Sequence, residues 1–222
     1  GINGDKAASA EIIKEIVVQL ASLYSYDELK LVFIFDEDDD WDYVKWLPHV
    51  WNKDNTFRYI ASSPDDIKEL STELEKEIDY RISHKEDDFP KMLIIASDKK
   101  MVESIDIMSV ILKQRNQLDI SILTAFGIYN YNNSDIIIEL SEEGPKVYDR
   151  TNNKVRDFVP YKVNEDTSLP VCFEKYLDMI SNIKLDISTE KYQLPKMLTF
   201  LDMFRVSKVE HLNSLSRWSE NN

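Results

Sequence analysis

Short apolar runs of strand length alternate with amphipathic stretches between residues 6 and 140 of this chain. The runs at 30–35 (KLVFIF), 92–96 (MLIIA) and 120–125 (ISILTA) are mostly apolar, which is typical of strands buried on both faces of a parallel sheet. In the stretches between them, apolar residues recur every three or four positions, which predicts helices. Because strands that alternate with helices are joined by right-handed crossovers, the pattern predicts an α/β fold with three layers.

The same spacing, together with helix start signals, places the individual elements. Ser63 can cap a helix whose first position is Pro64, which is a strong helix start. We expect helices at 6–24, 64–83, 100–113, 173–180 and 197–204. We expect further strands at 57–61 and 136–140, and antiparallel edge strands at 147–148 and 155–159.

These elements predict a mainly parallel sheet with RecA-like or Rossmann-like winding, antiparallel edge strands and a helical C-terminal extension. We expect the α/β domain to span residues 1–168, and the extension that packs on it to span 169–222. The chain has 222 residues and is 43% hydrophobic. That is enough to bury the core of one such domain without a disulfide or a metal.

The charge balance excludes some classes of partner. The chain carries a net charge of −14 and has no basic run, whereas nucleic-acid binding depends on Lys and Arg at the phosphates. We therefore expect no nucleic-acid partner. We also expect no membrane insertion, because no run reaches the roughly 18 apolar residues of a membrane helix.

Cysteine usage and the start of the chain bear on its cellular setting. The single cysteine, Cys172, cannot form an internal disulfide, which is consistent with a reducing cytoplasm. We also expect no signal peptide in this chain. The chain begins with Gly1 rather than an initiator methionine, which leads us to expect a piece of a longer protein.

The stretch before the first expected helix partly matches a phosphate-binding loop. In such a loop, G-x-x-x-x-G-K-[ST], backbone N–H groups and the lysine hold the phosphates, and the hydroxyl holds Mg²⁺. Residues 1–8 (GINGDKAA) place Gly4 and Lys6 in a comparable position. However, the glycine spacing is short, no hydroxyl follows Lys6, and Asp5 would repel a phosphate. We interpret Gly4 and Lys6 as a degenerate relic of the loop.

Asp98 is a second partial match. It ends the apolar run at 92–98 (MLIIASD), as an acid ends the magnesium-binding strand of such ATPases. Without a Lys–Thr pair Asp98 has little to coordinate, and it could instead meet solvent or cap a helix. We therefore expect no catalytic residue and no cofactor. A nucleotide-binding regulatory domain with weak ATPase activity is the alternative.

The acidic run at 36–42 (DEDDDWD) superficially resembles a calcium loop. That loop needs glycine at its sixth position and glutamate at its twelfth, where this chain has Trp41 and Leu47. We interpret the run as a solvated loop that follows a strand. The three histidines, His49, His84 and His211, have no ligand neighbours at metal spacing. The sequence therefore predicts no metal site.

A stretch rich in tryptophan begins inside this acidic run and extends to residue 51, and it also contains His49. Trp41, Trp46 and Trp51 could pack their segment against the sheet, with His49 hydrogen-bonded. They could instead form a docking surface, since Trp is enriched at interface hot spots. We favour packing and retain all four residues as interaction candidates. Further interaction candidates lie in a C-terminal apolar stripe, and these are Leu212, Leu215 and Trp218.

Three segments carry a resemblance to a known family. They are LASLYSYDELKLV at 20–32, WLPHVW at 46–51 with RYIA at 58–61, and TFLDMF at 199–204 with VEHLN at 209–213. On these segments the chain resembles a non-catalytic α/β domain of type VII secretion ATPases in the FtsK/SpoIIIE family (the EssC, YukB and EccC group). In that family the domain precedes the first motor domain.

The resemblance implies more than the residues alone do. It implies a membrane-anchored protein with tandem ATPase domains, assembled as a hexamer, that exports small helical WXG-type proteins. This chain would lie on the cytoplasmic side, between the membrane segments and the motors. Its partners would be the adjacent ATPase domains and other membrane components of the secretion system. We therefore expect a coupling domain, with docking of secreted substrates or adaptor proteins as a further alternative.

Overall fold

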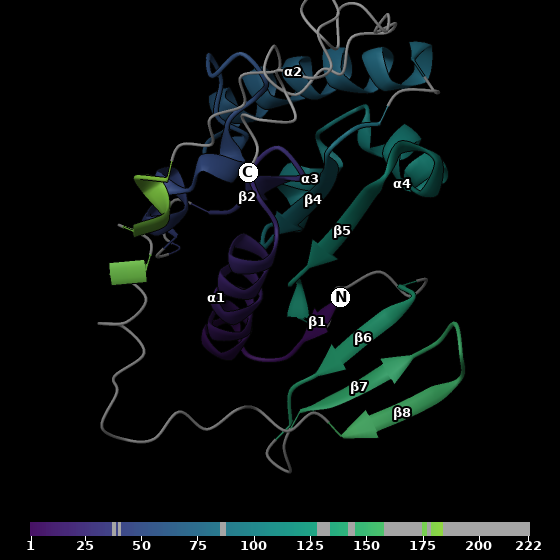
Figure 1. Cartoon of the computed structure of the whole chain (residues 1–222). Helices are drawn as coiled ribbons and strands as arrows, with labels where there is room; N and C mark the ends of the chain where they lie inside the picture. The colour runs from purple at the N-terminus through teal and green to yellow at the C-terminus, as the bar shows by residue number, and fades with distance from the viewer. Residues whose placement is uncertain are drawn as a thin grey trace, which may run out of the picture. The chain divides into compact units, whose positions relative to one another are not determined.

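The computed structural model (Figure 1) describes residues 1–36, 39, 41–84, 88–127, 134–141, 145–157, 175–176 and 179–183. The chain divides into two units, Gly1–Ile183 and Lys184–Asn222, and all described residues belong to the first. Cys172, the expected helix at 197–204 and the stripe with Leu212, Leu215 and Trp218 lie outside the described residues.

A four-stranded parallel sheet forms the centre of the first unit (Figure 1). Its strands, in the order β3-β2-β4-β5, are β3 (Ile60–Ala61), β2 (Leu29–Ile34), β4 (Lys91–Ala96) and β5 (Ile120–Thr124). β2 and β4 pair along their full length, from Leu29 opposite Lys91 to Ile34 opposite Ala96. The runs at 30–35 and 92–96 therefore form the two central strands, as their composition predicted, whereas the run at 120–125 forms β5 at the edge of this sheet.

Helices cover both faces of this sheet. One buried cluster joins Val32 and Ile34 of β2 to α2 (Pro64–Ser83), α3 (Lys99–Glu103) and α4 (Met108–Leu118). The other joins Leu31 and Phe33 to α1 (Lys6–Leu23) and to two short 3-10 helices, η1 (Asp42–Trp46) and η2 (Pro48–Val50). Successive residues of a strand point to opposite faces, so β2 contributes to both clusters. The three-layer α/β arrangement is confirmed.

A second, mixed sheet has the order β1-β6-β7-β8. It consists of β1 (Ile2–Asn3), β6 (Ile136–Glu139), β7 (Lys146–Asp149) and β8 (Lys154–Asp157). β1 is parallel to β6, whereas β6, β7 and β8 are antiparallel. Antiparallel strands are therefore present near both expected positions, but they belong to this second sheet, in which β7 lies inside and only β8 is at an edge.

Two expected elements differ from the structure. The single helix expected at 100–113 is two helices, because Ser104 ends α3. Its hydroxyl donates to the carbonyl of Met101 at 2.7 Å, which competes with continued helix hydrogen bonding. The strand expected at 57–61 is reduced to β3, because Phe57 and Tyr59 donate their backbone N–H groups to Asn52 and Val50 instead.

Part of the expected helix at 173–180 is described. Residues 175–176 and 179–181 are helical. Ile180 is buried in the cluster that contains α1, and the hydroxyl of Tyr176 is hydrogen-bonded to that of Ser22 at the end of α1. Chain beyond the expected domain boundary at 168 therefore packs on the α/β core, and the first unit extends to Ile183.

Candidate functional site

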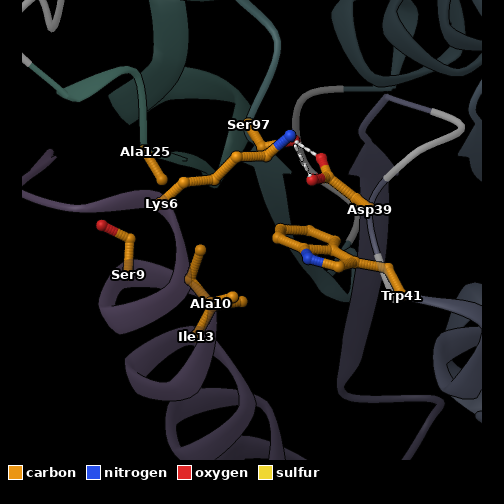
Figure 2. A pocket seen from close by; sticks show the side chains of 8 residues that line it. All are labelled: Lys6, Ser9, Ala10, Ile13, Asp39, Trp41, Ser97 and Ala125. Carbon is orange, nitrogen blue, oxygen red and sulfur yellow. Dashed lines mark hydrogen bonds and ion pairs between the residues drawn. The ribbon is translucent and has the colours of Figure 1, made fainter.

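The residues that follow the parallel strands meet the N-terminus of α1 at one small site (Figure 2). Lys6 comes from the first turn of α1 and Asp39 from the segment after β2. Ser97 and Ala125 directly follow β4 and β5. In open α/β sheets, ligands bind outside the carboxyl ends of the strands. This strand-end site is therefore where an ATPase-like domain would hold a nucleotide.

A strand–loop–helix connection leads into the site, as in a phosphate-binding loop. β1 ends at Asn3, and a Cβ atom at the following residue, Gly4, would lie 2.6 Å from the Cβ of Leu140. Gly4 therefore allows the close approach of two backbone segments in the mixed sheet. Asp5 caps α1, and its Oδ2 accepts the backbone N–H groups of Ala7 at 3.1 Å and Ala8 at 3.3 Å. These are the donors that a phosphate at the helix N-terminus would use.

Asp39 is the centre of a polar cluster in the strand-end site (Figure 2). Its Oδ1 lies 2.6 Å from the ammonium nitrogen of Lys6. Its Oδ2 accepts the hydroxyl of Ser97 at 2.7 Å and the backbone N–H of Asp36 at 3.2 Å. The side chain of Asp39 is only 6% exposed, whereas that of Lys6 is 65% exposed. At Asp39 the acidic run therefore turns inward, in contrast to the solvated loop that its composition predicted.

Apolar side chains fill most of the space below this cluster. Trp41 is 3% exposed, and its ring lies 5.9 Å from that of Phe33 and 5.4 Å from that of Phe35. The remaining cavity has a volume of about 10 Å³, which is the space of roughly one water molecule. With Asp39 in place, the described residues leave no cavity of phosphate size in the strand-end site.

Asp98 is not among the side chains that line this site. Its Oδ1 accepts the backbone N–H of Met101 at 2.8 Å and caps α3. This is the capping role that the sequence left as an alternative to magnesium binding. Among the described residues, no three His, Cys, Asp or Glu side chains come together as metal ligands would.

The structure separates the four interaction candidates of the Trp-rich segment. Trp41 and His49 are buried in the core, and His49 Nε2 donates to the carbonyl of Tyr24 at 2.9 Å. Trp51 is half-buried beneath the guanidinium of Arg58, which lies 4.4 Å from the centre of its ring. Trp46, by contrast, is 67% exposed. Packing therefore accounts for Trp41 and His49, and Trp46 is the candidate that a partner could reach.

Burial also sets the protonation state of His49. It lowers the pKa of the ring below the ordinary value, and this outweighs the opposite effect of the hydrogen bond to Tyr24. Nε2 carries the proton, since a carbonyl can only accept, and the buried Nδ1 has no hydrogen-bond partner. His49 is thus a neutral core residue at pH 7.

Sequence reasoning missed Asp39 and Ser97 as members of the strand-end site. A signal was available, because both residues come shortly after strands expected to be parallel. The carboxyl ends of such strands meet at one edge of a sheet. The acidic run offered several carboxylates, however, and nothing in their order distinguished Asp39 from its neighbours.

Comparisons with known proteins agree with this architecture. No family model matches the chain. The type VII secretion system protein EssC of Staphylococcus aureus (strain NCTC 8325 / PS 47) is 24% identical over 95% of this chain. The ESX secretion system protein YukB of Bacillus subtilis (strain 168) is 22% identical over 98%. In both cases the match covers 15% of the relative, so the chain spans about one seventh of these proteins.

Solved structures support the fold. The structure of EssC (ATPases 2 and 3) from Geobacillus thermodenitrificans aligns with 95% of this chain, and the alignment covers 49% of the EssC chain. The TM-score is 0.61 at 13% sequence identity. Thermomonospora curvata EccC (ATPases 2 and 3), in complex with a signal sequence peptide, matches 82% of this chain and 41% of its own. Its TM-score is 0.55 at 14% identity.

The fold is thus an ATPase-like α/β fold, and in the part of the chain that the structure describes, protein side chains fill the strand-end site. Among known proteins, the chain is similar over 95% and 98% of its length to the type VII secretion system protein EssC and the ESX secretion system protein YukB, at 24% and 22% identity. Among the described residues, no helix has the length and apolar character needed to cross a membrane.

Proposed function

We propose that this chain is a non-catalytic coupling and assembly domain of a membrane-anchored type VII secretion ATPase. It works at the cytoplasmic face of the bacterial membrane, and the whole protein drives export of WXG-type proteins. The observation that supports this most directly is the closed strand-end site. Lys6 and Ser97 both bond to the carboxylate of Asp39 at the strand ends, where phosphates would lie, and the cavity beside them has a volume of about 10 Å³.

Two further observations support a role without nucleotide chemistry. Asp98, which the sequence offered as a counterpart of a magnesium-binding acid, is used as the cap of α3. No hydroxyl residue follows Lys6 to hold a magnesium ion, since positions 7 and 8 are alanines. A domain with this fold and without these groups can transmit or resist motion through contacts. Its partners are the adjacent ATPase domains of the same protein, other membrane components of the system, and further copies in a hexamer.

Nucleotide titration tests the proposal against a weak regulatory ATPase. The purified chain is titrated with Mg-ATP by isothermal calorimetry, and its thermal unfolding is followed at millimolar nucleotide. We expect neither heat of binding nor a change in melting temperature, because the donors of the strand-end site are already satisfied internally. Binding at micromolar concentration would contradict the proposal and favour the regulatory ATPase.

Docking of secreted substrates or other secretion components is a second candidate function, and the exposure of Trp46 favours it. In the full-length protein, Trp46→Ala should reduce export while ATP hydrolysis by the motor domains is retained. Arg58→Lys, which weakens the stacking on half-buried Trp51, is a control at another tryptophan of the same segment and should leave export unchanged. Normal export by Trp46→Ala would rule out a docking role for this side chain.

A further inference from the structure

The donors around Asp39 are the kinds that hold a bound phosphate. A phosphate-binding loop uses a lysine ammonium and backbone N–H groups, with a hydroxyl nearby. The carboxylate of Asp39 accepts from the ammonium of Lys6, the hydroxyl of Ser97 and the backbone N–H of Asp36. Two oxygens with about four lone-pair positions suffice for all three donors.

Asp5 completes this internal substitution. In a phosphate loop the first N–H groups of the helix point at the ligand, whereas here the Asp5 carboxylate accepts those of Ala7 and Ala8. Two carboxylates thus share the donors that one phosphate would take. The carboxylate of Asp5 accepts from the helix N-terminus, and the carboxylate of Asp39 accepts from Lys6 and Ser97.

We infer that Asp39 is an internal anion that takes the place of a phosphate group and holds the strand-end site closed. The inference rests on the proposed non-catalytic function and gives it a mechanism. The site is closed because a carboxylate occupies it, in addition to the missing glycine and hydroxyl of the loop. An incoming phosphate would have to displace Asp39 or lie beside its negative charge. Solvent screens that charge little, since the side chain is 6% exposed.

Neutralising Asp39 should therefore open an anion site. The substitution Asp39→Asn removes the charge that holds this side chain against Lys6, so that a phosphate group can displace the side chain toward solvent and take its place. Inorganic pyrophosphate is the probe, titrated by calorimetry and by thermal shift into the wild-type chain and the variant. We expect the wild type to show no saturable binding. Asp39→Asn should bind pyrophosphate at least tenfold more tightly than the limit set by the wild type, with a rise in melting temperature.

Asp42→Asn is the matched control. It removes the same charge three residues away, but the Asp42 side chain is 81% exposed and pairs with Lys45 at 2.5 Å. It should leave pyrophosphate binding at the wild-type level.

A second control adds Lys6→Ala to Asp39→Asn. The double variant should lose the gained binding, because the ammonium group that would contact the anion is absent.

Three results would overturn the inference. They are a folded Asp39→Asn protein that gains no affinity, an equal gain in Asp42→Asn, and a gain that survives the loss of Lys6. Asp39→Ser carries the same expectations if Asp39→Asn does not fold. Micromolar binding of Mg-ATP by the wild type would instead contradict the proposed function itself, so the two failures are distinguishable.

Discussion

At the scale of single residues, buried polar side chains connect elements that the apolar core alone does not align. Arg81 of α2 is the clearest case, with a side chain that is 1% exposed. Its guanidinium donates to the carbonyl of Leu118 at 2.7 Å, to that of Pro90 at 2.9 Å and to Glu77 at 2.7 Å. It therefore ties α2 to the end of α4 and to the start of β4.

Replacing Arg81 with methionine should lower the free energy of unfolding by about 3 kcal/mol. Methionine keeps much of the volume but leaves two backbone carbonyls and Glu77 without their buried donor. Urea denaturation of the purified chain measures the change. Lys68→Met on the same helix is the control, because Lys68 pairs with Asp65 in solvent and should show no measurable loss. Equal losses in the two variants would contradict this role of Arg81.

His49 makes stability depend on pH in a defined window. Its folded-state pKa lies below the ordinary value of 6.5 because of burial. The unfolded chain therefore takes up a proton on His49 before the folded chain does, and stability falls as the pH drops through 6.5. The stabilisation that comes from the lowered pKa of His49 is fully present above pH 6.5 and is lost progressively below it.

His49→Gln isolates this effect, since glutamine can still donate to the carbonyl of Tyr24. Between pH 7.5 and 5.5 the wild type should lose more stability than the variant, with an upper limit of about 1.4 kcal/mol. Denaturation midpoints across this range give the difference, and His84 and His211 are present in both proteins. Parallel pH profiles for the two proteins would show that His49 does not carry the dependence.

At the scale of elements, the segment from Trp41 to Trp51 acts as an irregular layer on one face of the parallel sheet. η1 and η2 bury Val44, Leu47 and Val50 in the cluster that also contains α1. The two ends of η1 differ, because Trp41 just before it is buried and Trp46 at its last position is exposed. Within this short stretch, Trp41 therefore packs in the core, whereas Trp46 lies at the surface.

Trp41→Ala should cost about 4 kcal/mol in free energy of unfolding, since it leaves a large cavity against Phe33 and Phe35. Trp46→Ala removes the same side chain five positions later and should change stability by less than about 0.5 kcal/mol. Thermal or urea denaturation of both variants measures the contrast. A large loss in Trp46→Ala, or a small one in Trp41→Ala, would contradict the observed burial.

At the scale of the whole molecule, the net charge of −14 acts on every element at once. Like charges repel one another most strongly in the compact state, and salt screens this repulsion. Raising sodium chloride from low to physiological concentration should therefore raise the melting temperature. A gain of about 3 °C corresponds to about 1 kcal/mol for a unit of this size.

Calorimetric or fluorescence melting curves at several chloride concentrations test this expectation. Chloride is the appropriate anion, because sulfate also stabilises proteins through exclusion from their surface. A melting temperature that is constant or falls with salt would show that local ion pairs such as Lys6–Asp39 outweigh the general repulsion.

Much of the fold could be predicted from the sequence because its signals are local. The runs at 30–35 and 92–96 are apolar enough to be central strands in any arrangement, and they became β2 and β4. Ser63 and Pro64 start α2 where expected, and Ser63 forms a capping box with Asp66. Local competition explains the main error, since the hydroxyl of Ser104 ended a helix that apolar spacing alone continued.

The sequence by itself determined the three-layer α/β architecture, the incomplete phosphate loop at Gly4 and Lys6 and the acidic character of the chain. Only the tertiary structure decided that Asp39 is the buried partner of Lys6 and Ser97, that Asp98 caps a helix and that Trp46 is exposed. The physical reason is range. Periodicity and capping act over a few neighbouring residues, whereas Lys6 and Ser97 meet Asp39 from positions 33 and 58 residues away along the chain. Chain order alone does not encode such a meeting, since it depends on where β2 and β4 end in space.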